Sequence, residues 1–258
     1  MKENEEFPKP IENDDRNDAI IRKDNSLKRL DISFNKHIEL EEYKKSNLLA
    51  YWIQDFSKYH DNEKFFNPKS LKIFKRGNII KVNLGFNVGN ELGGLHYCVV
   101  INKSDNLNSG NLNVIPLSSA KENKIYNKNT CIDLGDELYT SLNKKLNLEY
   151  YNVRQQLSKL NNSNYYEEIK QISKKLDVLE ATQAELDKMK HGSFALVHQI
   201  TTISKQRIFK NPLLSKIKLS NDSLNLIDNK IKELYTKWFV IFHKIFVYFI
   251  WQWTYYIV

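Results

Sequence analysis

The spacing of apolar residues divides the chain into stretches of different character. In the first periodic stretch they recur at intervals of three and four residues, at Leu49, Trp52, Ile53 and Phe56. This spacing is typical of one face of a helix, so we expect a helical extension over residues 37–70. Asn67-Pro68 should end it. Residues 1–36 are polar and charged with little periodicity, and the sequence predicts disorder there.

From residue 71 onward the pattern changes to short apolar runs separated by turns. Five such runs indicate strands, at residues 78–84, 97–101, 112–117, 130–134 and 194–197. A loop with four glycines, residues 85–94, follows the first run. Several short strands with regular turn signals predict a small β-barrel. We therefore expect a barrel domain over residues 71–236, mostly β in its core and α+β overall.

A helical pattern returns inside this domain. Two series of apolar or seam positions step by three or four: Leu142, Leu146, Tyr150, Val153, Leu157 and Leu160, then Ile169, Ile172, Leu176, Leu179, Gln183 and Leu186. A turn-forming run, residues 161–164, separates them. This arrangement predicts an antiparallel coiled-coil hairpin inserted at residues 138–190. Asn221-Asp222-Ser223 then offers an N-cap for a helix that runs to about residue 237.

The end of the sequence, residues 237–258, is dense in aromatic and apolar residues. Residues 238–258 are about long enough to cross a bilayer, which takes roughly 20 apolar residues. His243, Lys244 and Gln252 interrupt this run. Three interpretations stay open: a membrane anchor, an oligomer or core strand, and sequence that is foreign to the domain.

Charge and cysteine content narrow the class of protein. The chain has 39 Lys and Arg against 31 Asp and Glu, a formal charge of +8. This excess favours a polyanionic partner such as nucleic acid. The two cysteines, Cys98 and Cys131, lie in apolar runs. They form neither a disulfide framework nor a zinc site, and they suit a reducing cytoplasm. We expect no secretory signal and a cytoplasmic location.

Four segments carry a resemblance to one family. They are residues 75–84, 91–101 (with Gly93-Gly94 before His96), 114–119 and 193–207. In this order they resemble the first three strands and the late strand of the MazF/PemK toxins of type II toxin-antitoxin systems. The resemblance covers about residues 74–134 and 192–236. It does not cover the N-terminal extension, the helical hairpin or the tail.

This resemblance implies a fold, an activity and partners. It implies an SH3-like barrel, a homodimer, and metal-independent endoribonuclease action on single-stranded RNA, with no cofactor. In this chemistry the 2′-hydroxyl of the RNA attacks the phosphate and leaves a 2′,3′-cyclic phosphate. A base, an acid and donors to the phosphoryl oxygens are needed. The resemblance also implies a cognate antitoxin, and DNA binding in complex with it.

The sequence departs from the family at the residues that matter most. The catalytic Arg expected after the double glycine is His96, and the expected Asp-Gln pair is His198-Gln199. The hydroxyl residue at the end of the third strand is kept as Ser118. Since histidine titrates near neutral pH, we hypothesise that His96 and His198 act as base and acid on one groove. Ser118 and the amides of Gly93 and Gly94 would stabilise the phosphoryl oxygens.

Further residues are candidates for holding the RNA. They are Arg76, Lys81, Gly93, Gly94, Tyr97, Ser119 and Gln199. Tyr97 would stack on a base, and the basic residues would contact phosphates. The alternatives are a Tyr97 buried in its strand, solvated basic side chains, and a His198 that only forms structural hydrogen bonds.

Two other functions compete with the ribonuclease. One is a nucleic-acid-binding module that kept the barrel and lost catalysis with the Arg. The other is an interaction protein that docks a partner or a membrane through its coiled-coil hairpin and the tail at residues 238–258.

Overall fold

The computed structural model describes residues 15–121, 125–160, 165–189, 192–214 and 216–236. The chain divides into two compact units, Met1–Lys58 and Tyr59–Val258. The first unit contains α1 (Arg16–Glu39) and most of α2 (Tyr43–Asn62). Helix α2 lies within the stretch at residues 37–70 where a helical extension is expected, and its Trp52 and Phe56 rings pack with centroids 5.7 Å apart.

Helix α1 lies where the sequence favours disorder. The side chain of Asp15 caps it by accepting a hydrogen bond of 2.9 Å from the Asp18 amide. No residue of α1 is buried. Apolar residues do recur at helical spacing within α1, at Leu27, Leu30, Phe34 and Ile38, so the sequence contains a signal for this helix.

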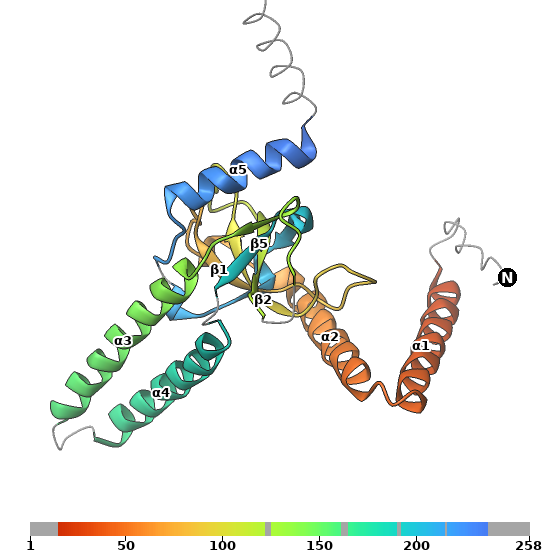
Figure 1. Ribbon diagram of the computed structural model, residues 1–258. Coiled ribbons are helices and arrows are strands. Elements are labelled where there is room, and N and C mark those ends of the chain that lie inside the picture. Colours follow the sequence, from red (N-terminus) through yellow and green to blue (C-terminus); the bar gives the residue numbers. More distant parts are fainter. Residues whose placement is uncertain (1–14, 122–124, 161–164, 190–191, 215, 237–258) are drawn as a thin grey trace, which may run out of the picture. The chain divides into compact units, whose positions relative to one another are not determined.

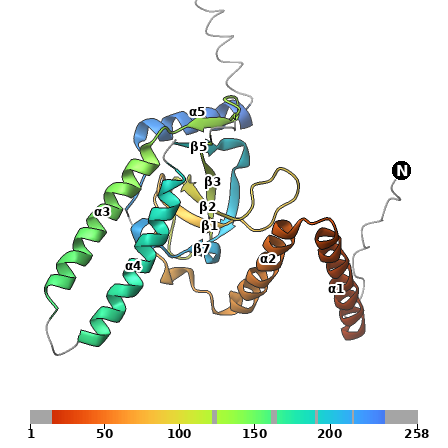
Figure 2. The ribbon, with the colours of Figure 1, turned by 60° about the horizontal axis from the view of Figure 1, so that its bottom comes forward.

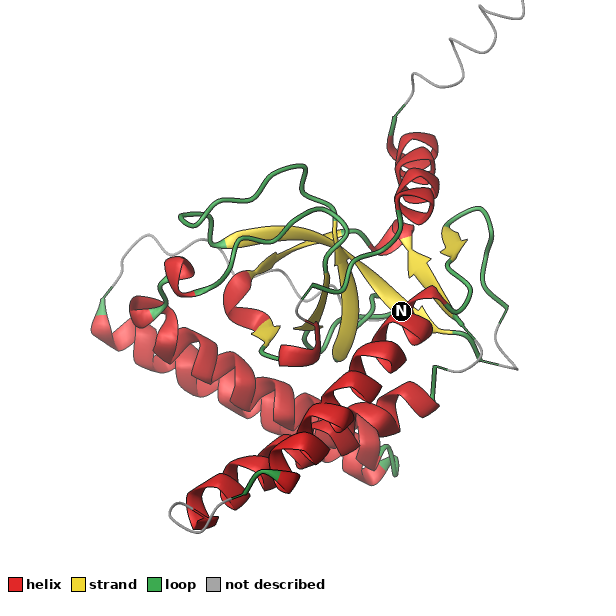
Figure 3. Cartoon of the chain, turned by 90° about the vertical axis from the view of Figure 1, so that its left-hand side faces the viewer, coloured by secondary structure: helices red, strands yellow, loops and turns green. Residues whose placement is uncertain are grey.

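The second unit contains an antiparallel sheet. Its strands are β1 (Ile79–Asn83), β2 (Leu95–Val100), β3 (Asn111–Ser119), β4 (Cys131–Asp133), β5 (Ser193–Leu196), β6 (Thr201–Ser204) and β7 (Ile208–Phe209). The strand order is β4-β5-β3-β2-β1-β7, and β6 also pairs with β3. Figure 3 shows the strands gathered into one curved sheet. The structure confirms the five expected strands and an α+β fold. The SH3-like barrel stays a prediction.

Short 3₁₀ helices connect these elements. They are η1 (Glu63–Phe65), η2 (Pro68–Ser70), η3 (Val197–Gln199), η4 (Lys205–Arg207) and η5 (Pro212–Leu214). Of these, η3 matters for the site, because it carries His198 at the end of β5.

Successive side chains along each strand point to opposite faces of the sheet, and this gives one apolar layer on each face. Side chains such as Val99 and Ile115 join one core cluster, whereas Cys98 and Val114 join another on the opposite face. The first cluster also receives Leu224 and other side chains from α5 (Asn221–Tyr235), which covers this part of the sheet in Figure 1. The sheet is therefore buried on both faces.

The expected helical hairpin consists of α3 (Glu137–Ser158) and α4 (Tyr165–Asp187). The two helices run side by side and join β4 to β5, which pair with each other (Figure 2). At the base, Leu142, Leu146 and Leu186 are almost fully buried in the main core cluster. Towards the far end, Leu157 is exposed. Val153 and Ile172, further along the two helices, are also buried in this cluster. The hairpin therefore contributes to the core along most of its length.

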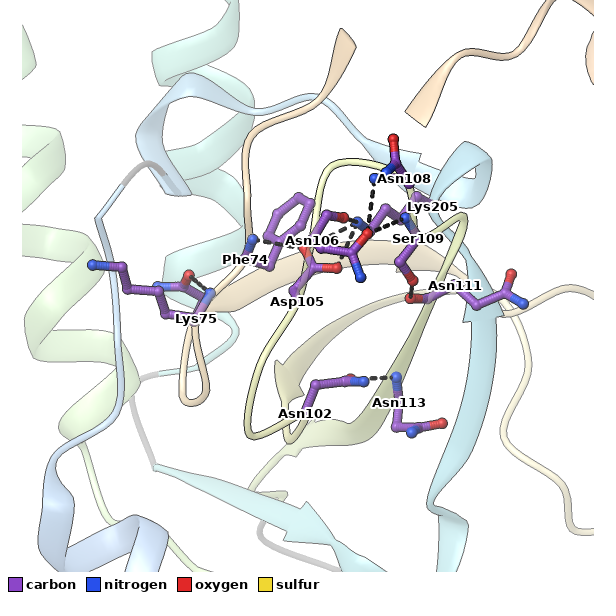
Figure 4. Close-up of polar contacts among 11 residues, drawn as sticks. Phe74, Lys75, Asn102, Asp105, Asn106, Asn108, Ser109, Asn111, Asn113 and Lys205 are labelled. Atoms are coloured by element: carbon purple, nitrogen blue, oxygen red, sulfur yellow. Dashed lines mark hydrogen bonds and ion pairs between the residues drawn. The ribbon is translucent and has the colours of Figure 1, made fainter. Parts of the chain in front are cut away.

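A fully buried ion pair anchors the loop between β2 and β3 (Figure 4). Lys205 Nζ donates to both carboxylate oxygens of Asp105, at 2.7 and 2.9 Å, and to the Asn106 carbonyl at 3.2 Å. The Phe74 amide donates to the same carboxylate at 2.9 Å. Both charged side chains are only 1% exposed. All three ammonium protons have acceptors, which offsets the desolvation of this pair.

Among the described residues, no helix is long and apolar enough to cross a membrane. The apolar tail at residues 237–258, on which the anchor interpretation rests, lies outside the described residues.

Candidate functional site

The ends of β2 and β3 bring together two residues that are predicted to be catalytic. The register between the two strands ends at the pair of Cys98 with Pro116, and His96 and Ser118 each lie two residues beyond it. His96 Nδ1 lies 3.3 Å from the Leu117 carbonyl oxygen. Both residues line one cavity of about 360 Å³. The remaining lining residues are Lys81, Leu95, Tyr97, Leu117, Ser119, Lys121, Glu185, Lys188, Met189 and Ser193.

A buried tyrosine fixes the Ser118 hydroxyl. Ser118 Oγ lies 3.0 Å from the Tyr126 hydroxyl, which donates to the Ser119 carbonyl at 2.7 Å. The Tyr126 ring is stacked on Phe194 with centroids 4.0 Å apart. Since Tyr126 has a single hydroxyl proton and gives it to Ser119, Ser118 is the donor to Tyr126. Sequence reasoning missed Tyr126.

A carboxylate from the inserted hairpin binds two strand residues that line the cavity. Glu185 on α4 forms an ion pair with Lys81 and accepts a hydrogen bond of 2.6 Å from the Tyr97 hydroxyl. Lys81 Nζ also lies 5.6 Å and 5.4 Å from the ring centroids of Tyr97 and Phe209. Burial, reinforced by Glu185, raises the pKa of Tyr97, which keeps its hydroxyl protonated.

These contacts correct two expectations. Tyr97 is 9% exposed and bound to Glu185, so its ring is not free to stack on a base. Lys81 is 7% exposed and committed to Glu185 rather than to solvent or a phosphate. Sequence reasoning missed Glu185 because it lies on a helix rich in charged residues, where such side chains are usually solvated.

Arg76 also has a structural role in place of the predicted RNA contact. Its guanidinium donates to the Ile101 carbonyl and forms an ion pair with Asp228 on α5. Arg76 therefore ties α5 to the start of the sheet.

His198 and Gln199 lie elsewhere, beside a second cavity of about 360 Å³. Its other lining residues are Leu84, Asn87, Glu91, Leu92, Pro116, Ile200, Thr201, Ile203 and Arg207. His198 Nδ1 lies 3.3 Å from the Thr130 carbonyl. The two cavities share no lining residue. The hypothesis that His96 and His198 act on one groove therefore finds no support in this arrangement.

Gln199 and the double glycine shape the loop before β2. Gln199 accepts from the Leu92 amide and donates to the Asn90 carbonyl, each at 3.2 Å. A Cβ on Gly93 would lie 2.6 Å from the Gly85 carbonyl oxygen. The Gly94 amide already donates to that same oxygen at 2.6 Å. The glycines thus close the loop, and the Gly94 amide is not free to bind a phosphoryl oxygen, contrary to expectation.

Comparison with known proteins finds one family that is similar to part of the chain. Residues 75–176 match the family described as PemK-like, MazF-like toxin of type II toxin-antitoxin system. This stretch is therefore PemK/MazF-like. The match runs from β1 into α4, and so contains His96 and Ser118 but neither Ser193 nor His198. No curated protein matches the chain.

Proposed function

We propose that this PemK/MazF-like protein is the toxin of a type II toxin-antitoxin system and cleaves single-stranded RNA without a metal. The observation that carries the proposal is the meeting of His96 and Ser118 in one cavity at the ends of β2 and β3. These positions correspond to the catalytic Arg and the hydroxyl residue of the family in the resemblance described above. The excess of positive charge, +8, suits an RNA substrate.

The chemistry follows from the residues in this cavity. The 2′-oxygen of the RNA attacks the adjacent phosphorus, the bond from phosphorus to the 5′-oxygen breaks, and a 2′,3′-cyclic phosphate remains. One proton leaves the 2′-hydroxyl and one reaches the 5′-oxygen. His96 serves one of these two transfers, because imidazole both accepts and donates protons near neutral pH. The Ser118 hydroxyl turns from Tyr126 to donate to a phosphoryl oxygen.

The partners follow from the same family. We propose a cognate antitoxin that neutralises the domain, a homodimer as the active form, and operator DNA binding by the complex with the antitoxin.

An RNA digestion tests this function. The purified full chain should convert single-stranded RNA into fragments with 2′,3′-cyclic phosphate and 5′-hydroxyl ends. The yield should be the same with and without EDTA. Intact RNA after prolonged incubation would overturn the proposal, and EDTA-sensitive cleavage would overturn its metal independence.

The second candidate is a binding module without catalysis. It is favoured by the replacement of the family's Arg by His96 and by the separate location of His198. Tight binding of RNA or DNA that stays uncut would support this candidate over the enzyme. Expression in a bacterial host offers a second readout, since only the enzyme should arrest growth with accumulation of cyclic-phosphate ends.

A further inference from the structure

One buried hydroxyl in the His96 cavity has no hydrogen-bond partner among the residues that the structure describes. Ser193, the first residue of β5, is 2% exposed, and its Oγ makes no hydrogen bond within the described part of the chain. Its backbone is satisfied, because its amide donates to Gly135 and its carbonyl accepts from Leu134, each at 2.9 Å. Buried polar groups are nearly always hydrogen-bonded, so an orphan hydroxyl on a cavity wall indicates a missing ligand.

A second hydroxyl stands beside it. Ser119 on β3 pairs directly with Ser193 on β5, and both residues line the cavity. Side chains of directly paired residues lie on the same face of a sheet, with Cβ atoms about 4.5–5.5 Å apart. Two neighbouring hydroxyls therefore face one space, where both can donate to one acceptor.

The charge of the cavity fits an anion. Lys81, Lys121 and Lys188 line it together with one acid, Glu185, which gives 3 − 1 = +2 with His96 neutral. Because Lys81 is committed to Glu185, the remaining positive charge belongs to Lys121 and Lys188, both exposed at the rim. Hydroxyl donors inside and ammonium groups at the rim are suited to a phosphate group.

We propose that Ser119, Ser193, Lys121 and Lys188 form a subsite for an RNA phosphate next to the one that is cleaved. The subsite rests on the proposed function and deepens it. It assigns a role to the inserted hairpin, because Lys188 directly follows α4 and Glu185 on α4 holds the adjoining wall. The hairpin thus completes the RNA site of this toxin domain as well as its core.

Binding of an uncleavable RNA tests the subsite in the full chain. The probe is a single-stranded RNA oligonucleotide with 2′-O-methyl groups, which lacks the attacking hydroxyl. Log affinity is measured against log salt for the unmodified chain, Lys188→Gln and the control Lys174→Gln. Lys174 is an exposed lysine on α4, the helix that Lys188 directly follows. Lys188→Gln should reduce the slope by about 0.7, the value for one phosphate contact on a single strand, and Lys174→Gln should not.

The Ser193→Ala variant distinguishes a role of this hydroxyl in RNA binding from a role in the stability of the fold. Removing an unpartnered buried hydroxyl should leave the melting temperature unchanged or raise it, while RNA affinity falls by about fivefold or more, because a hydrogen bond to a charged group is lost. A melting temperature that falls together with the affinity would mean a structural role and overturn the subsite.

The outcomes distinguish the two proposals. If the unmodified chain neither cuts RNA nor binds the probe, the proposed function fails and the subsite fails with it. If it binds or cuts RNA while Lys188→Gln and Ser193→Ala keep its slope and affinity, only the subsite fails.

Discussion

At the residue scale, the resemblance to the MazF/PemK toxins places His96 where the family has an arginine. Arginine as a residue type stays charged at every physiological pH, whereas histidine can accept and donate a proton near neutrality. Under the proposed function, His96 would transfer a proton where the family's arginine would stabilise the phosphate by its charge. The lysines at the cavity rim, Lys121 and Lys188, supply positive charge at the same cavity.

Buried Cys98 gives the fold a measurable pH dependence. Burial raises the pKa of its thiol to about 12, from an ordinary value of 9.0. Since the folded pKa is the higher one, the contribution of Cys98 to stability is complete below pH 9.0 and is lost as pH rises towards about 12. The slope should be about 1.4 kcal/mol per pH unit. Denaturant unfolding across this window should show that loss in the unmodified chain. A Cys98→Ala variant with the same slope would contradict it.

The buried pair between Lys205 and Asp105 should dominate local stability. Lys205→Met leaves the Asp105 carboxylate unpaired at 1% exposure. We expect a loss of about 3–5 kcal/mol in the free energy of unfolding, measured by urea titration. Lys128→Met, at an exposed loop position, should change it by less than about 0.5 kcal/mol. Equal effects of the two substitutions would contradict the role given to the pair.

At this scale, the sequence predicts a site residue when that residue belongs to a recognisable motif. His96 and Ser118 follow from the glycine loop and from the end of a strand. Glu185 and Ser193 could not be predicted, because their role depends on how the hairpin packs against β1 and β2. Lys81, Arg76 and Tyr97 carry the right chemistry for RNA, but tertiary contacts use them for the fold.

At the element scale, the two ends of the inserted hairpin differ in how deeply their leucine side chains are buried. Leu186 at its base is 0% exposed in the main core, whereas Leu157 towards its far end is 43% exposed. Leu186→Ala should therefore cost about 2–5 kcal/mol in the free energy of unfolding, and Leu157→Ala much less. Urea titration of both variants checks this. If Leu186→Ala lowered the free energy of unfolding no more than Leu157→Ala does, the base of the hairpin would not be part of the core.

The same scale shows why some elements were predictable. Strands β1 to β5 carry apolar runs that bury their side chains, so the pattern reveals them. Strand β6 begins with two exposed threonines and β7 has only two residues, which is too short for any pattern. Helix α1 buries no residue, and its apolar positions, Leu27, Leu30, Phe34 and Ile38, lie among many charged residues that obscure the pattern.

At the scale of the whole molecule, the chain combines a helical unit at residues 1–58 with the unit that carries the toxin domain. The family match accounts for β1 to β4 and part of the hairpin, and the structure adds β5 and η3, which complete the two cavities. The proposed function assigns RNA cleavage to the cavity that contains His96 and Ser118.

The most direct test compares His96→Ala with the unmodified full chain in cleavage of single-stranded RNA. Loss of a general acid or base should lower the rate by about 10²–10⁴-fold, with the fold intact by circular dichroism. His60→Ala, at an exposed histidine that lines neither of the two cavities described here, is the matched control and should keep the full rate. Undiminished release of cyclic-phosphate fragments by His96→Ala would contradict the account.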